Sequence, residues 1–291
     1  MTTQLTTTNT FEKLTWTWQG HKIQYTVMGA GQPLLLIHGF GASIGHWRKN
    51  IPIFAAKGYK VFAIDLLGFG GSDKPGLDYN LELWKQQIKD FWEAEIKQPT
   101  VFVGNSIGGL LSLMVMSEFP QITAGGILIN CAGGLNHRPD ELKFPLGFIM
   151  GTFTKLVSSP LTGKFIFNNV RQKKRIRNTL YQVYRDRAAV TDELVDLLYE
   201  PSCDSGAAQV FASVLSAPPG AHPRELLPKI QHPLLVLWGE ADPWTPIAGA
   251  AIYQNSPNIE FYPIPNAGHC PHDEKPEIVN ELILTWLKGL A

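Results

Sequence analysis

The feature that most constrains this 291-residue chain is a glycine-flanked serine at the end of a short apolar run. The run Val101–Val103 leads into the hexapeptide GNSIGG at 104–109, and a mostly apolar segment then continues to Phe119. This pattern predicts a strand, a sharp turn at Ser106 and a helix, which exposes the serine hydroxyl in front of the helix N-terminus. Gly104 and Gly108 fit the turn because a Cβ there would collide with a neighbouring strand or helix. We therefore predict that Ser106 is a nucleophile.

Apolar runs alternate with helix-like segments on both sides of this turn. A continuous apolar run is typical of a strand that is buried on both faces. Strands that alternate with helices indicate an α/β fold, with a mostly parallel sheet and helices on both of its faces. Near the start, apolar and polar residues alternate on either side of Gln19-Gly20, which predicts an antiparallel hairpin. The predicted buried strands are 33–37, 61–64, 101–103, 126–129, 234–237 and 259–262, and the predicted helices are 81–96, 110–118 and 277–287.

The alternation is interrupted between residues 133 and 226. This segment has no buried-type strand run, is rich in phenylalanine and carries helix-like stretches. Because the strand pattern resumes at Leu234, we predict a helical lid at 133–226, inserted into a core made of 1–132 and 227–291. Phe148 and Phe153 are candidate contacts for an apolar substrate. Packing of the lid phenylalanines against the core explains the same pattern equally well.

Two residues late in the chain complete a candidate catalytic triad. A serine hydroxyl is a weak nucleophile and needs a base, and the base needs an orienting group. Open α/β sheets bind ligands beyond the carboxyl ends of their strands, so the candidates should follow strands directly. Asp242 follows the strand 234–237, and His269 follows the strand 259–262. We predict that His269 is the base and that Asp242 orients it, with Glu240 as the alternative carboxylate.

The backbone N–H groups of Phe40 and Ile107 are the predicted oxyanion donors, because one follows the first buried strand and the other follows the nucleophile. His38 lies beside this loop, where we predict a structural hydrogen-bonding role. Asp65 precedes a glycine-rich loop that lacks the lysine and the spacing of a phosphate-binding loop. We therefore predict that Asp65 tethers a turn, and we exclude a nucleotide site. The other histidines that compete as bases are His46, His137, His222, His232 and His272.

Composition excludes several classes of function. Lys+Arg and Asp+Glu number 25 each, so no overall field favours nucleic acid. The three cysteines are odd in number and widely spaced, which argues against a disulfide framework or a metal site. The predicted chemistry needs neither a metal nor an organic cofactor. The Thr-rich start has no apolar h-region, and no apolar run approaches 18 residues, so we expect neither a signal peptide nor a membrane span.

A basic run lies within the predicted lid. One interpretation is a solvated helix face. The other is peripheral contact with an anionic membrane surface, because the run lies beside apolar lid helices. The basic residues are Arg171, Lys173, Lys174, Arg175 and Arg177.

These motifs resemble the α/β-hydrolase superfamily over essentially the whole chain. A serine nucleophile separates the chain from the epoxide hydrolase and haloalkane dehalogenase branches, which use aspartate. Gly-Asn-Ser-x-Gly-Gly also occurs in meta-cleavage C–C hydrolases, where an aromatic residue typically follows the catalytic histidine and this chain has Cys270. The matching elements are the turn at Ser106, His38-Gly39-Phe40-Gly41, Trp238-Gly239 through Asp242, and Gly268-His269.

The closer resemblance is to the chlorophyll dephytylase and pheophytinase family, of the cyanobacterial type. It rests on GNSIGG, on the lid stretch Pro201–Val214 with Ser216–Gly220, and on 242–246, although Ser205 stands where we expect proline. The resemblance implies an α/β-hydrolase fold with an inserted helical lid. It also implies a serine hydrolase that cleaves the phytyl ester of chlorophyll or pheophytin through an acyl-enzyme. Asn105 and Trp244 join the lid phenylalanines as candidate substrate contacts.

The same resemblance implies a cytoplasmic protein, with peripheral contact to the thylakoid membrane as a further expectation. Two alternatives remain open for the activity. One is an esterase or lipase-like enzyme, or a C–C hydrolase, acting on another apolar substrate. The other is a slow-turnover ligand receptor of the same fold, because a triad establishes chemical competence and not biological role.

Overall fold

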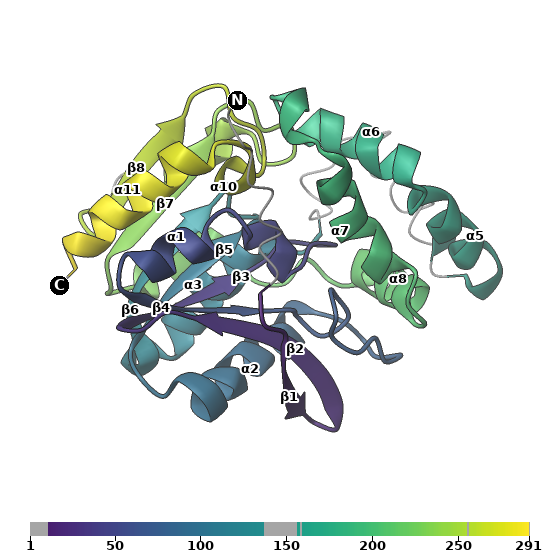
Figure 1. Ribbon diagram of the computed structural model, residues 1–291, viewed down its shortest axis with the longest axis horizontal. Coiled ribbons are helices and arrows are strands. Elements are labelled where there is room, and N and C mark those ends of the chain that lie inside the picture. The colour runs from purple at the N-terminus through teal and green to yellow at the C-terminus, as the bar shows by residue number, and fades with distance from the viewer. Residues whose placement is uncertain (1–10, 137–155, 158, 255, 291) are drawn as a thin grey trace, which may run out of the picture.

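A single twisted sheet forms the centre of the protein, whose computed structural model describes residues 11–136, 156–157, 159–254 and 256–290 (Figure 1). The strands in these ranges are β1 (Leu14–Trp18), β2 (His21–Met28), β3 (Gln32–Ile37), β4 (Tyr59–Ile64), β5 (Thr100–Asn105), β6 (Thr123–Ile129), β7 (Leu234–Gly239) and β8 (Ile259–Ile264). They follow the order β1-β2-β4-β3-β5-β6-β7-β8. Only β2 pairs in antiparallel fashion, with β1 and β4, and the other pairs are parallel. The predicted hairpin and the mostly parallel sheet are confirmed.

The buried strands divide their side chains between two apolar clusters. Leu35 and Ile37 of β3 pack with α2 (Leu81–Phe91) and α3 (Ile107–Glu118) on one face of the sheet. Leu34 and Leu36 pack with α1 (Ile51–Ala56) and α11 (Pro276–Lys288) on the other face (Figure 1). Successive side chains of a strand point to opposite faces, so a strand covered on both faces is apolar at every position. This explains the continuous apolar runs and confirms the predicted layers.

Short helical turns complete the core. The predicted helix 81–96 is divided, because α2 ends at Phe91 and a π-helical turn, η2 (Trp92–Ile96), follows it. Lys97 then closes this turn with a left-handed backbone, at φ 60°. The remaining core elements are η1 (Ile44–Trp47), η3 (Pro120–Ile122), η6 (Leu227–Lys229), η7 (Ile247–Tyr253) and α10 (Pro271–Glu274).

The chain between β6 and β7 is helical in its described residues, where no strand occurs. The division into a lid at 133–226 and a core made of 1–132 and 227–291 remains a prediction. Phe148 and Phe153 lie outside the described residues. No helix in the described ranges is long and apolar enough to cross a membrane. The inserted elements are α5 (Pro160–Val170), α6 (Lys173–Val183), η5 (Arg187–Ala189), α7 (Asp192–Ser202), α8 (Ala207–Ser216) and α9 (Pro223–Leu226).

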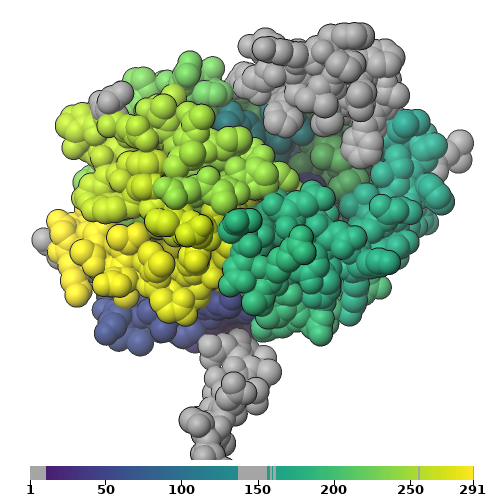
Figure 2. All heavy atoms as spheres, turned by 90° about the horizontal axis from the view of Figure 1, so that it is seen from above, coloured from purple at the N-terminus to yellow at the C-terminus, as the bar shows by residue number. Residues whose placement is uncertain are grey.

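A third apolar cluster joins the inserted helices to the core. Leu180, Val183 and Tyr184 at the end of α6 pack with Leu194 of α7 and with Cys270, which precedes α10. In Figure 2 the teal surface of the inserted helices accordingly meets the yellow surface of the C-terminal residues. The insertion therefore packs against the loop that follows β8.

Candidate active site

Ser106 occupies a strained turn between β5 and α3. Its backbone has φ 56° and ψ −121°, and such a conformation costs a non-glycine residue roughly 1–3 kcal/mol. The end of β6 and the residues after it hold the turn: the N–H of Ser106 donates to the carbonyl of Ile129 at 3.0 Å, and its carbonyl accepts from the N–H of Ala132 at 3.1 Å. The strand, turn and helix predicted from GNSIGG are confirmed.

The two glycines that flank the serine are required by close backbone packing. A Cβ at Gly104 would overlap the carbonyl oxygen of Gly108 in the first turn of α3. A Cβ at Gly108 would overlap the carbonyl oxygen of Ile37 at the end of β3. The predicted reason for these glycines is therefore correct.

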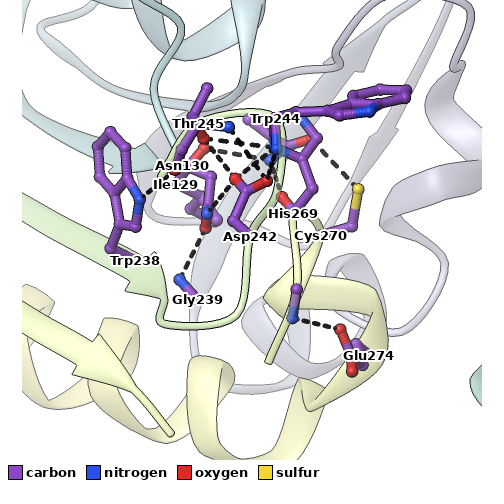
Figure 3. Close-up of polar contacts among 12 residues, drawn as sticks. Ile129, Asn130, Trp238, Gly239, Asp242, Trp244, Thr245, His269, Cys270 and Glu274 are labelled. Carbon is purple, nitrogen blue, oxygen red and sulfur yellow. Dashed lines mark hydrogen bonds and ion pairs between the residues drawn. The ribbon is translucent and has the colours of Figure 1, made fainter. Parts of the chain in front are cut away.

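His269 and Asp242 form a buried pair beyond the carboxyl ends of β7 and β8 (Figure 3). Nδ1 of the imidazole lies 2.6 Å from Oδ2 of the carboxylate, and each residue is 4% exposed. A carboxylate can only accept, so Nδ1 carries the proton and Nε2 is the nitrogen with a free lone pair. Glu240, the alternative carboxylate, is exposed to solvent. The structure therefore brings Asp242, and not Glu240, to the imidazole.

Every neighbour of the Asp242 carboxylate donates a hydrogen bond to it. Oδ1 accepts from the backbone N–H groups of Trp244 at 2.8 Å and Thr245 at 3.1 Å. Oδ2 accepts from Nδ2 of Asn130 at 2.7 Å and from the Thr245 hydroxyl, besides His269. Burial alone would raise the pKa of Asp242, but the hydrogen bond and charge of His269 and the Thr245 contacts outweigh it. The pKa lies below its usual value, so the carboxylate is charged at neutral pH.

Asn130 and Thr245 are members of the site that sequence reasoning did not assign. Asn130 directly follows β6 at φ 43°, and its Oδ1 accepts from the N–H of Gly239 at 2.9 Å. Thr245 lies three residues after Asp242, a spacing at which an aspartate commonly caps the following backbone N–H groups. The position of Asn130 at the end of a strand, and the spacing of Thr245 from Asp242, are the sequence signals that could have identified these two residues.

Asn105 ties the nucleophile turn to the loop of His269. Its Nδ2 donates to the carbonyls of Ile129 at 3.1 Å and His269 at 3.0 Å, and the residue is 2% exposed. The amide is thus engaged inside the protein, where it links the two loops, and a contact between Asn105 and substrate remains a prediction. Trp244 is 52% exposed, and its ring centroid lies 5.3 Å from that of His269. A contact between Trp244 and substrate remains a prediction.

The predicted oxyanion donors belong to the loop after β3 and to the residue that follows Ser106. The loop after β3 runs against the serine, since a Cβ at Gly39 would lie 3.2 Å from the Cβ of Ser106. Neither the N–H of Phe40 nor that of Ile107 donates a hydrogen bond within the described ranges. Ile107 is also the first residue of α3, where the helix dipole favours negative charge. Both groups thus remain predicted oxyanion donors.

His38 and Asp65 have the structural roles predicted for them. Nε2 of His38 accepts from the N–H of Leu66 at 3.0 Å, so its Nδ1 carries a proton and donates to Gly39 at 2.7 Å. Burial lowers the pKa of His38. Asp65 accepts from the N–H groups of Gly71 at 2.8 Å and Ile44 at 2.7 Å, which tethers the glycine-rich loop.

An apolar cavity of about 150 Å³ opens beside Phe40, between the core and the inserted helices. A second, more polar cavity of about 600 Å³ adjoins it and shares Phe167, Arg171 and Ser202 in its wall. Among the described residues, no group of three or more His, Cys, Asp or Glu could hold a metal ion. The residues that line the smaller cavity include Phe69, Phe167, Val170, Val210 and Phe211.

The model of the alpha/beta hydrolase family matches residues 34–282, and the chain belongs to this family. It is 29% identical to the chloroplastic pheophytinase of Arabidopsis thaliana over 88% of this chain and 61% of the relative, so it spans about three-fifths of that protein. It is 27% identical to the 2-hydroxy-6-oxo-6-(2'-aminophenyl)hexa-2,4-dienoic acid hydrolase of Metapseudomonas resinovorans, over 94% of this chain and 89% of that protein. The crystal structure of CarC, a serine hydrolase involved in carbazole degradation, matches with a TM-score of 0.76 at 25% identity, covering 96% of this chain and 99% of that one. The protein is therefore a hydrolase of the α/β-hydrolase superfamily.

Proposed function

We propose that this hydrolase cleaves the phytyl ester of chlorophyll or pheophytin to give phytol and the phytol-free pigment. The observation that carries the proposal is a serine in a strained turn whose neighbour Asn105 is bonded to the loop of a buried His–Asp pair, together with an apolar cavity lined by Phe40. The similarity to a relative named pheophytinase supports the choice of pigment ester.

In the proposed reaction, Ser106 attacks the ester carbonyl while Nε2 of His269 takes the hydroxyl proton. Asp242 stabilises the imidazolium, and the N–H groups of Phe40 and Ile107 receive the charge on the tetrahedral oxygen. Collapse of the intermediate releases phytol, which takes the proton from His269, and leaves an acyl-enzyme on Ser106. Water, activated by His269, then hydrolyses the acyl-enzyme to the carboxylic acid of the pigment.

The cavity beside Phe40 suits an apolar alcohol chain. A volume of about 150 Å³ holds roughly one benzene-sized group, so it takes the part of a phytyl chain nearest the ester. The remainder extends past Phe167 toward the larger adjoining cavity. Each buried CH₂ contributes roughly 0.8 kcal/mol to binding. Residues of the lid stretch on which the pigment resemblance rests, 201–214, line both cavities.

A charge at the rim of the cavity should impair long-chain esters selectively. Val170 lines the cavity and is 41% exposed, so Val170→Asp is compatible with folding. We expect kcat/KM for a phytyl ester in detergent to fall about tenfold, because the chain then meets a carboxylate that must lose water. Hydrolysis of p-nitrophenyl acetate should not change. Phe165→Asp is the matched control, since Phe165 is on the same helix, is 73% exposed and lies outside the wall of the cavity. Equal effects of both variants on the phytyl ester would contradict this use of the cavity.

We also propose that the basic run of α6 contacts the anionic thylakoid surface from which the pigment is drawn. Lys173 is not free for this role, because its Nζ pairs with Asp196 at 2.5 Å, and Arg177 pairs with Asp192. Lys174 and Arg175 are exposed and form no ion pair with a described residue. These two side chains are therefore the basis of the proposed membrane contact.

Reversing both charges, in Lys174→Glu/Arg175→Glu, should weaken binding to phosphatidylserine-containing vesicles by at least about 30-fold, since the loss of each basic residue alone removes about 1 kcal/mol near such a surface. The measurement is co-sedimentation at low ionic strength. Lys57→Glu/Lys288→Glu is the control of equal charge change, because both lysines are exposed on the core. Unchanged binding, or the same loss in the control, would show that this face does not contact the membrane.

The pigment assignment is tested by incubating the protein with chlorophyll a and with pheophytin a, followed by chromatography of the products. We expect release of the phytol-free pigment over many turnovers, which also excludes a slow-turnover receptor. Cleavage of p-nitrophenyl acetate without conversion of either pigment would refute the pigment assignment and leave the serine hydrolase chemistry intact.

A C–C bond hydrolase is the second candidate, favoured by the match to the Metapseudomonas hydrolase over 94% of this chain. The same assay separates the two functions when it includes 2-hydroxy-6-oxo-6-(2'-aminophenyl)hexa-2,4-dienoic acid, the compound for which that relative is named. We expect conversion of the pigment esters and not of the dienoic acid. The reverse result would establish the second candidate.

A further inference from the structure

The segment that ends α6 is bonded directly to the loop that carries His269. The N–H of His269 donates to the carbonyl of Val183 at 2.8 Å. A Cβ at Gly268 would overlap that same carbonyl, so the two backbones are in van der Waals contact. The backbone of His269 is therefore held from both sides, since its carbonyl accepts from Asn105 of the core.

Glu274 joins these two segments through both of its carboxylate oxygens. Oε2 accepts from the N–H of Gly268 at 2.7 Å, and Oε1 accepts from the N–H of Asp186 at 2.6 Å. Figure 3 shows the first of these bonds on the side of the loop away from Asp242. Glu274 is 8% exposed, and its own N–H is bonded to the carbonyl of Cys270 at 2.9 Å. A nearly buried carboxylate thus connects the residue before the imidazole to the inserted helices.

The inserted segment is itself anchored, so it can serve as a support. The Tyr184 hydroxyl donates to Oδ2 of Asp273 at 2.9 Å and accepts from Nε2 of His46 at 2.8 Å. Oδ1 of Asp273 pairs with Arg48 at 2.9 Å and Lys49 at 3.1 Å. Tyr184 and Asp273 are 2% and 0% exposed. The backbone next to Val183 is thereby fixed to the core, independently of Glu274.

We propose that Glu274 is a positioning residue for His269: its carboxylate holds the His269 loop against the anchored segment Val183–Asp186 and so keeps the imidazole aligned with Asp242. The inference rests on the proposed function, in which His269 is the base. Nothing in the proposed chemistry touches Glu274, which acts through the backbone N–H groups that it accepts, from Gly268 on one side and from Asp186 and its neighbour Arg185 on the other. A neutral amide at this position cannot accept from both sides, because its NH₂ group would face the donors on one of them.

Glu274→Gln tests this role, and Glu277→Gln is the control, since Glu277 is an exposed carboxylate three residues away on α11. We expect kcat for p-nitrophenyl acetate to fall 10–100-fold in Glu274→Gln, because a misplacement of about 1 Å in a catalytic group can cost about 100-fold. The KM should stay within about twofold, since binding contacts are unchanged. The labelling of Ser106 by a fluorophosphonate should slow by the same factor as kcat. The downfield proton resonance of the His269–Asp242 hydrogen bond should broaden in Glu274→Gln alone.

Asp186→Pro is a second variant for the case in which Glu274→Gln does not fold. It removes the N–H that Glu274 accepts from residue 186, together with the side-chain oxygen that caps the N–H of Ala188, and the φ of −88° at Asp186 is close to the range of proline. The positioning role would be overturned if either folded variant were labelled at the wild-type rate and kept a sharp His269–Asp242 resonance. An equal loss of kcat in Glu277→Gln would overturn it as well. The two claims can fail separately. If the fluorophosphonate does not label even the wild-type protein, the proposed serine chemistry is refuted. If the His269–Asp242 resonance is nevertheless broadened in Glu274→Gln and not in Glu277→Gln, the alignment of the His–Asp pair by Glu274 is still supported.

Discussion

Replacing Ser106 with alanine should abolish ester hydrolysis, lowering kcat by about 10⁶-fold, the loss typical when a serine nucleophile is removed. Alanine keeps the Cβ that the strained turn already accommodates and removes only the hydroxyl that forms the acyl-enzyme. The affinity for pigment should therefore be unchanged, because the apolar cavity beside Phe40 is intact. Steady-state kinetics and equilibrium binding of pheophytin a, measured on the same variant, check both halves of this expectation.

Ser112→Ala is the matched control for that experiment. Ser112 is on α3, the helix that follows Ser106, and is fully buried, and its hydroxyl donates to the carbonyl of Gly108 at 2.8 Å. Such a bond within one helix contributes little, so the control should keep its activity. Substantial turnover by Ser106→Ala would mean that another group attacks the ester, and the proposed mechanism would fail.

Replacing Asp242 with asparagine should lower kcat by about 10⁴-fold. The carboxylate now accepts from His269, Asn130, Thr245 and the N–H of Trp244, and no neighbour accepts from it. An asparagine amide has only one oxygen, so its NH₂ group must face either the backbone N–H donors at the Oδ1 position or the side-chain donors, including His269, at the Oδ2 position. When it faces His269, Nδ1 loses its proton, and the proton on Nε2 prevents the imidazole from receiving that of Ser106.

Glu240→Gln separates this effect from a general loss of charge near the site. Glu240 lies two residues away in the same loop and is exposed, so kcat should remain at the wild-type value. Comparison of the two variants by steady-state kinetics therefore decides which carboxylate orients the base. A large loss in Glu240→Gln with little change in Asp242→Asn would reverse the assignment.

The parts of the fold and site that sequence could predict are those with local causes. A strand buried on both faces must be apolar at every position, which makes β3, β5, β6 and β7 visible as runs. The turn at Ser106 is visible because only glycine fits the backbone contacts at 104 and 108. Asp242 and His269 could be located because the carboxyl ends of parallel strands meet at one edge of the sheet.

The parts that sequence could not predict depend on contacts between distant residues. The hydrogen bond between Glu274 and Asp186 joins residues that are 88 positions apart in the sequence, and that between Asn105 and His269 joins residues that are 164 positions apart. The hexapeptide motif could not reveal that the amide of Asn105 points into the protein, because that depends on where the loop after β8 lies. Asp65 and His38 could be assigned structural roles, since their partners lie in neighbouring loops at the ends of β3 and β4.

The central claim is that Ser106 becomes acylated by the pigment, and trapping the intermediate tests this most directly. The protein is mixed with pheophytin a, quenched in acid at early times, digested and examined by mass spectrometry. We expect the peptide containing Ser106 to gain the mass of the phytol-free pigment less one water. This adduct should appear before free product and should be absent from Ser106→Ala. Product formation with an unmodified Ser106 peptide at every time, or an adduct on another residue, would contradict the claim.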